Sequence, residues 1–244
     1  MDILYILGTG SNWDNNEIRY SLRSLDKYGK NVGRIFIAAP KLPEFINPAA
    51  VTWVPATDPT KRNHKNIQHK IETAIYHSDI AEEFLVSSDD HFYTRETDFD
   101  NYPYYKKGTL PSKLMPERDN GYWQSLVATR KLLEYFALPV FSTNPHCNTH
   151  FTKSLYIANQ AIMDAGYNTN EGTEVNCLMG NILAERGAKY VNFRDVKIYH
   201  IQDRADLERQ IGQNDCFSIS DVALEEGMKE YLKEKYPDKS RWEL

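Results

Sequence analysis

The sequence has little of what marks secreted, membrane-spanning and nucleic-acid-coating proteins. Its three cysteines are too few and too widely spaced for a disulfide framework or a zinc site. No stretch approaches the roughly 18 apolar residues of a membrane-spanning helix, and the first residues lack the basic segment and long apolar stretch of a signal peptide. Basic residues are not in excess, because 29 Lys and Arg face 34 Asp and Glu, for a net charge of −5. We therefore predict a cytoplasmic protein that does not rely on bulk positive charge to hold nucleic acid.

The composition is that of an ordinary globular protein. The chain has 244 residues, of which 41% are hydrophobic and 26% are charged, which suits a domain that buries a core. It contains no internal repeat and no low-complexity linker. We predict a single domain over residues 1–244, made of an α/β half at 1–96 and a mostly helical half at 97–244.

The N-terminal half alternates between expected strands and helices. Residues 3–7 form a short apolar run that is typical of a buried parallel strand. A helix with one apolar stripe follows, and Asp14 or Asn15 could cap its start. Further strands at 34–38 and 51–54, and a helix at 63–77, continue the alternation. This order predicts an α/β fold with a mostly parallel sheet.

The C-terminal half is expected to be mostly helical. Residues 97–120 are rich in Tyr, Pro, Lys and Gly without a clear period, which indicates a functional loop or lid. A pair of strands is expected at 190–193 and 196–199. Helical patterns cover 125–136, 152–165, 173–186 and 221–235.

Two adjacent acids, Asp89 and Asp90, follow an apolar strand at 84–86 and form the sharpest local signal. Open α/β sheets bind ligands at the carboxyl ends of their strands. Paired carboxylates repel each other unless a cation or a basic group lies between them, and Mg²⁺ or Mn²⁺ binds carboxylates together with substrate phosphates. The pair therefore indicates a metal site that neutralises a diphosphate, with a plain Ser/Asp turn as the alternative.

Several residues of the N-terminal half could bind a nucleotide. The loop Gly8, Thr9, Gly10 and Ser11 follows the first strand, so its amides could meet phosphate, although it matches neither a dinucleotide fingerprint nor a P-loop. A tight turn is the alternative there. Polar side chains on the two helices could clamp phosphate or could pair with acids on a solvated face. These are Arg19, Arg23, Lys65, Asn66 and Lys70, and we take Arg19, Asn66 and Lys70 as donor-binding candidates.

Three residues of the C-terminal half are candidates for proton transfer or metal binding. His146 could act as an acid or base, or could be a packing residue; no Glu lies between it and His150, which excludes a zinc-protease motif. Glu174 is either a favourable first-turn charge of a helix or a residue that faces the acceptor. His200 could complete the coordination of the metal, or could be a polar residue at a strand end. No Gly-x-Ser-x-Gly elbow or recognisable cysteine nucleophile supports a hydrolytic triad.

One run of sequence resembles a known family. Residues 14–25, DNNEIRYSLRSL, are similar to the most recognisable block of the Stealth family, which comprises sugar-phosphate transferases of capsule synthesis and the related lysosomal-enzyme phosphotransferase. Further blocks are similar in the expected order, so the resemblance extends over residues 3–243. They lie at 34–37 with 43–48, 84–92, 216–221 and 236–243.

The resemblance implies a glycosyltransferase-A-like fold of nucleotide-diphospho-sugar transferases, with a divalent metal at Asp89 and Asp90. It also implies that Asp14 belongs to the site and that His146 is functional. After His146 the chain reads CNTH in place of the proline-containing stretch of the family, and NEG at 170–172 replaces a basic residue expected before Glu174. These departures favour transfer of a plain sugar over transfer of a sugar phosphate.

We therefore expect a metal-dependent glycosyltransferase that uses Mn²⁺ or Mg²⁺. It would move a sugar from a nucleotide-diphospho-sugar to a hydroxyl group of a polysaccharide or of a modified DNA base. The second acceptor is considered because the chain also resembles compact phage-encoded transferases that decorate DNA bases. The N-terminal half would hold nucleotide and metal, the C-terminal half would hold the acceptor, and His146, Glu174 and Asp90 would be catalytic. The alternatives are a Stealth-type sugar-1-phosphate transferase and a non-catalytic module that binds nucleotide sugar or carbohydrate. A DNA acceptor would require a basic groove with stacking tyrosines, formed by Lys106, Lys107, Lys113 and Arg118.

Overall fold

A five-stranded sheet forms the centre of the computed structural model, which describes residues 1–118, 120–195 and 197–244. The strand order is β4-β3-β1-β5-β9. Strands β4, β3, β1 and β5 are parallel, and β9 runs antiparallel to β5 at one edge. This arrangement confirms the predicted α/β fold with a mostly parallel sheet. The strands are β1 (Asp2–Ile6), β3 (Ile35–Ala39), β4 (Thr52–Pro55), β5 (Glu83–Ser88) and β9 (Thr149–Thr152).

Alternate residues of the central strands face two different cores, because successive side chains of a strand point to opposite sides. Leu4 and Phe36 pack with the apolar residues of α2 (Asn63–His77), whereas Tyr5 and Ile37 pack with those of α1 (Asn16–Tyr28). All four side chains are fully buried. Burial on both faces explains why β1 and β3 read as continuous apolar runs.

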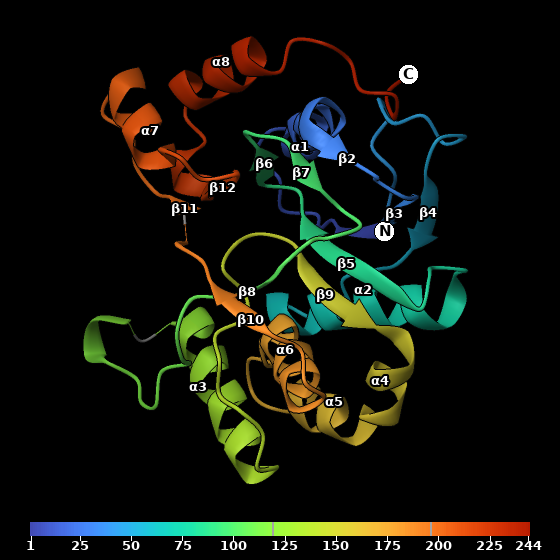
Figure 1. The fold of residues 1–244 in the computed structure, drawn as a ribbon, viewed down its shortest axis with the longest axis vertical. Coiled ribbons are helices and arrows are strands. Elements are labelled where there is room, and N and C mark those ends of the chain that lie inside the picture. The colour runs from blue at the N-terminus through green and yellow to red at the C-terminus, as the bar shows by residue number, and fades with distance from the viewer. Residues whose placement is uncertain (119, 196) are drawn as a thin grey trace.

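Helices of the C-terminal half cover the α2 side of the sheet (Figure 1). Among them, α6 packs against β9 and α2, while α5 packs against α2 and α3. Leu126, Met163 and Met179 join the apolar residues of α2 in one core. The predicted helix at 152–165 is in fact a strand residue followed by two short helices. The bounds are α3 (Gly121–Tyr135), α4 (Lys153–Ala158), α5 (Gln160–Tyr167) and α6 (Val175–Glu185).

A second, three-stranded sheet continues from the first. Strand β6 pairs antiparallel with β12, which pairs in parallel with β11. Only Asp89 and Asp90 separate β5 from β6 along the chain, so the acidic pair joins the two sheets. Phe92 and Phe217 form a core with residues of α7 and α8. The bounds are β6 (His91–Tyr93), β11 (Lys197–Ile198), β12 (Cys216–Ile219), η2 (Asp221–Ala223), α7 (Arg204–Ile211) and α8 (Glu226–Lys235).

The short elements correct two expectations. Segment 97–120 was expected to be a loop, and its residue 119 lies outside the described residues. The described part contains strand β7, which pairs with β2, strand β8, which pairs with β10, and the short helix η1 (Pro116–Arg118). The expected strand pair at 190–193 and 196–199 is wrong, because β10 and β11 belong to different sheets; Val196 lies outside the described residues. The bounds are β2 (Gly29–Lys30), β7 (Thr97–Asp98), β8 (Tyr104–Lys106) and β10 (Tyr190–Asn192). No described helix combines the length and the hydropathy that crossing a bilayer requires.

Candidate active site

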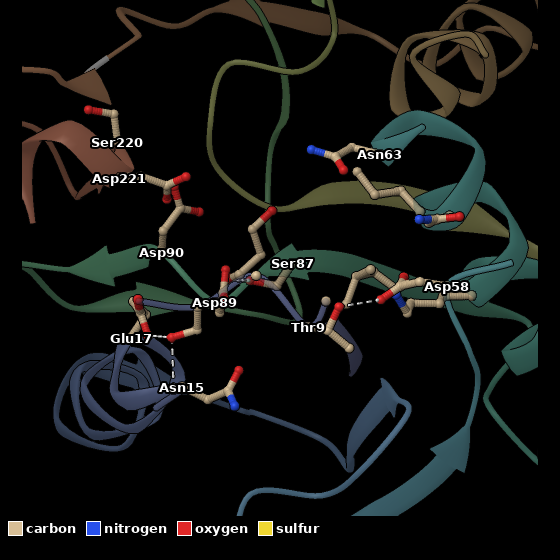
Figure 2. Close-up of a pocket in the computed structure, with 18 of the residues that line it drawn as sticks. Thr9, Asn15, Glu17, Asp58, Asn63, Ser87, Asp89, Asp90, Ser220 and Asp221 are labelled. Atoms are coloured by element: carbon tan, nitrogen blue, oxygen red, sulfur yellow. Dashed lines mark hydrogen bonds and ion pairs between the residues drawn. The ribbon is translucent and has the colours of Figure 1, made fainter. Parts of the chain in front are cut away.

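A cavity of about 560 Å³ opens at the carboxyl ends of β1 and β5. Residues of the loop after β1, the turn after β5, the start of α2, the start of α6 and the second sheet line it. Figure 2 shows Glu17, Asp90 and Asp221 on one side of the cavity and Asp58 and Asn63 on the other. This is the sheet edge where open α/β folds bind ligands. The predicted site residues that line the cavity are Gly8, Thr9, Gly10, Ser11, Asn66, Lys70, Asp89, Asp90 and Glu174.

The acidic pair lies in the turn between β5 and β6, and its two carboxyl groups have different environments. Lys197 Nζ lies 2.6 Å from Asp90 Oδ2. Burial, followed by the charges of Asp90 and Glu17, raises the pKa of Asp89 to about 8. Burial also acts to raise the pKa of Asp90, but Lys197 and two nearby histidines hold it below its usual range. At neutral pH the pair therefore carries one ionised carboxylate and one largely protonated carboxyl group.

Two further carboxyl groups, those of Glu17 and Asp221, line the same cavity, although the sequence does not predict either as a site residue. Burial raises the pKa of Glu17, and the charges of Asp221 and Asp90 add to that effect. Among the described residues, no group of three or more His, Cys, Asp or Glu side chains is arranged to hold a metal ion. A cation at the pair would therefore need oxygen atoms of substrate and water to complete its coordination.

Ser11 orders the loop between β1 and α1. Its hydroxyl group donates a hydrogen bond to Glu17 at 2.9 Å and accepts from the backbone N–H groups of Trp13 and Asn15 at 3.1 and 2.8 Å. Asp14 and Asn15 have positive φ angles of 52° and 57°, a conformation that Asp and Asn tolerate better than most residues. The expected side-chain cap is absent, because α1 begins after Asn15 and that side chain makes no capping hydrogen bond.

Lys70 and Asn66 are buried at the wall of the cavity and not on a solvated face. Lys70 forms an ion pair with one carboxylate oxygen of Asp58, and the hydroxyl group of Thr9 donates to the other oxygen at 3.4 Å. Asn66 Oδ1 accepts from the N–H and hydroxyl groups of Thr60 at 3.1 and 3.0 Å. These bonds fix the segment before α2 and bring Asp58 and Thr60, which the sequence does not mark as site residues, into the lining.

Arg19 and Asp14 lie outside this cavity. They line a neighbouring hollow of about 660 Å³, which shares Asn15 with the first. Arg19 Nε lies 3.7 Å from a carboxylate oxygen of Glu243. Arg23 forms two hydrogen bonds to the same carboxylate, at 2.8 and 2.9 Å, so it joins α1 to the C-terminal segment. The structure therefore places neither arginine against the acidic pair.

The three C-terminal candidates have different positions. Glu174 is buried and lines the cavity just before α6. His146 does not line it, although its charge acts on Asp90. Its Nδ1 lies 2.8 Å from Asp195, which is itself 2.6 Å from Lys107 Nζ. His200 is exposed and also outside the lining, because the chain leaves the second sheet after β11. The structure does not bring His200 together with the acidic pair.

Comparisons with known proteins identify the fold. No protein-family model matches the sequence, and no curated protein matches it. The structure is similar to that of the galactosyltransferase LgtC in complex with donor and acceptor sugar analogues, with a TM-score of 0.52, 10% identity, and coverage of 98% of this chain and 96% of that chain. An active-site mutant of LgtC gives a TM-score of 0.49 at 10% identity, covering 96% of this chain and 95% of that chain. The similarity to the LgtC complex confirms the predicted glycosyltransferase-A-like fold.

Proposed function

We propose that this protein is a glycosyltransferase that moves a sugar from a nucleotide-diphospho-sugar donor to an acceptor hydroxyl group, with a divalent cation at Asp89 and Asp90. The observation that carries the proposal is the acidic pair inside a cavity at the carboxyl edge of the sheet. The volume of about 560 Å³ lies in the range of small-molecule sites. The similarity of the fold to that of the galactosyltransferase LgtC also supports the transfer of a sugar.

The residues at the acidic pair fit Mg²⁺ or Mn²⁺. Carboxylate oxygens are the hard ligands that both cations prefer, and the raised pKa of Asp89 indicates a buried carboxyl group without enough positive charge around it. Asp89 and Asp90 would hold the cation, with substrate oxygens in place of the predicted ligand His200. When bound, the cation would neutralise the negative charge of the leaving diphosphate.

The remaining residues of the cavity have roles that their chemistry suggests. On the side of the cavity opposite Asp90, Glu17 and Asp221, Thr9 and Asp58 offer hydroxyl and carboxylate oxygens to the nucleoside. The backbone amides of residues 8–10, which line the cavity in the same loop, would meet the phosphates. In an inverting reaction, Glu174 or His146 would take the proton of the acceptor hydroxyl group, and Glu174 is the one that lines the cavity.

The acceptor that we propose to test first is a polysaccharide. The cations expected to form a DNA groove are already engaged: Lys106 lies 3.9 Å from the ring centre of Phe141, Arg118 lies 4.5 Å from that of Trp123, and Lys107 pairs with Asp195. Neither these residues nor Lys113 line the cavity. A modified DNA base is the second acceptor to test.

The proposal is tested by a screen of nucleotide sugars, scored by release of nucleoside diphosphate with and without polysaccharide or DNA. We expect release that requires Mn²⁺ or Mg²⁺ and that stops in Asp89→Ala. The matched control is Asp238→Ala, since Asp238 is exposed and does not line the cavity. Full activity in the presence of chelator would exclude a role of the cation in the reaction. A product that gains phosphate with the sugar would favour the Stealth-type alternative, and donor binding without any release would favour a non-catalytic module.

A further inference from the structure

A histidine that the proposed reaction does not yet use lies beside Glu174. His64, in the first turn of α2, has its Nδ1 atom 3.7 Å from Glu174 Oε2. Both side chains are largely removed from solvent, with exposed fractions of 13% and 5%. His64 Nε2 lies 3.0 Å from Ser125 Oγ on α3. One imidazole ring therefore connects α2, α3 and the start of α6 at a residue that lines the cavity.

The hydrogen bonds of Ser125 determine which nitrogen of His64 carries a proton. The Ser125 hydroxyl group donates to the backbone carbonyl of Tyr122 at 2.7 Å, and a hydroxyl group has only one proton to donate. Ser125 Oγ must then accept its second bond from His64 Nε2–H. In a neutral ring, Nδ1 would turn a lone pair towards the Glu174 carboxylate, whereas a proton on Nδ1 makes the contact an ion pair.

We propose that His64 is a positioning residue that holds the Glu174 side chain towards the cavity, so that Glu174 accepts the proton of the acceptor hydroxyl group. This inference rests on the proposed function. In the step, the acceptor oxygen forms a bond to the anomeric carbon while the bond from that carbon to the diphosphate oxygen breaks. The electron pair of the broken bond leaves with the nucleoside diphosphate, the proton passes to Glu174, and the anomeric configuration inverts.

The other titratable groups near the pair do not replace His64. The charge of Glu174 acts on Tyr122 of α3 and on Cys177 of α6, and burial raises the pKa of both, that of Cys177 to about 12. Both groups therefore stay neutral near pH 7 and cannot balance a carboxylate. Two cations at the start of α2 have other partners: Arg62, just before the helix, pairs with Glu171, and Lys65 lies over the ring of Tyr167.

The first test needs no activity. Ring-nitrogen chemical shifts in the NMR spectrum report the surroundings of each imidazole nitrogen, and His64 signals can be assigned from their loss in His64→Gln. At one fixed pH, we expect the Nδ1 shift of His64 to differ between the wild type and Glu174→Gln, because the Glu174 side chain faces that nitrogen. His77, exposed at the other end of α2, should not change and serves as the control. An Nδ1 shift of His64 that is identical in both proteins would overturn the inference.

The second test uses transfer kinetics and separates the inference from the proposed function. We expect His64→Gln to lower kcat by about 100-fold, within the range of proton-transfer catalysis, with little change in the donor Kd or in the melting temperature. Glu174→Gln should lower kcat at least as far, and the double variant should lose no more than Glu174→Gln, because the two residues act as one unit. His77→Gln is the matched control. Wild-type kcat in His64→Gln would overturn the role of His64, whereas a wild type that transfers no sugar would overturn the proposed function and leave the NMR result to decide the contact.

Discussion

Replacing Asp89 by asparagine is expected to stabilise the cation-free protein while abolishing nucleotide release. Burial, then the charges of Asp90 and Glu17, raises the pKa of Asp89 to about 8 in the folded protein, whereas an aspartate of the unfolded chain has a pKa of about 3.9. As the pH rises from 4 towards 8, the unfolded chain releases this proton and the folded protein keeps it. Stability therefore falls over this range and levels off above it. Asparagine cannot ionise, so the stability of the variant does not fall in this way as the pH rises.

The size of the effect follows from the pKa difference. One pKa unit corresponds to about 1.4 kcal/mol, so full burial would cost about 4 kcal/mol between pH 4 and 7. Asp89 retains some contact with solvent at the cavity wall, which screens the charge, so we expect Asp89→Asn to gain about 2 kcal/mol at pH 7.5. For a chain of this length that gain raises the melting temperature by about 4–8 °C. The gain should shrink towards pH 4.5.

The assay is urea unfolding in chelator between pH 5 and 9, with Asp238→Asn as the control for removing a surface acid. Addition of Mn²⁺ or Mg²⁺ should narrow the difference, because a cation that binds only the folded wild type stabilises it by mass action. A variant that is as stable as the wild type, or less stable, at every pH would refute the account of Asp89 as a buried carboxyl group without sufficient counter-charge. That result would instead favour the interpretation of Asp89 and Asp90 as an ordinary turn.

Three further substitutions test other parts of the structure. Lys197→Met removes the ammonium group 2.6 Å from Asp90, so the pKa of Asp90 should rise and the donor Kd, measured by calorimetry, should increase about tenfold. An unchanged Kd would contradict the role of Lys197 as the counter-charge of Asp90. Arg23→Gln leaves the buried carboxylate of Glu243 without its bidentate partner and should lower the free energy of unfolding by about 3 kcal/mol, whereas a loss below about 0.5 kcal/mol would show a weak pair. Gly180→Ala would press a β-carbon into the side chain of Thr143 and should lower the free energy of urea unfolding by about 1–3 kcal/mol. An unchanged free energy of unfolding would mean that the segment around Thr143 can move aside.

The elements that could be predicted from the sequence are those whose burial leaves a periodic or continuous apolar pattern. Strands β1 and β3 are covered on both faces, and α2 begins and ends at the predicted residues 63 and 77. Strands β6, β9 and β12 were not expected, because each has only three or four residues and depends on pairing with a distant segment. His150 illustrates the difficulty: it lies in edge strand β9, where its Nε2 contacts the backbone carbonyl of Tyr102, and nothing in the local sequence indicates that partner.

The candidate site could be predicted where it follows an apolar strand directly. Asp89 and Asp90 and the loop at 8–11 come straight after β5 and β1, so the edge-of-sheet rule was enough to place them in the cavity. Lys197 could not be placed in this way, because its strand has two residues and its ion pair with Asp90 spans 107 positions of the chain. Glu17 lies in the first turn of α1, where an acid is favourable without any further role, and only the structure shows that it also contributes to the electrostatics of the acidic pair.

The cavity depends on the C-terminal segment as much as on the N-terminal half. Strand β6, directly after the acidic pair, completes its sheet with β12 and β11, and this sheet carries Lys197 while Asp221 follows it. The core between Phe92 and Phe217 and the ion pair between Arg23 and Glu243 hold these late residues against α1 and β6. A division at residue 96 therefore separates strands that pair with each other. Because the counter-charge of the acidic pair comes from the last quarter of the chain, we expect nucleotide binding to require residues on both sides of that division.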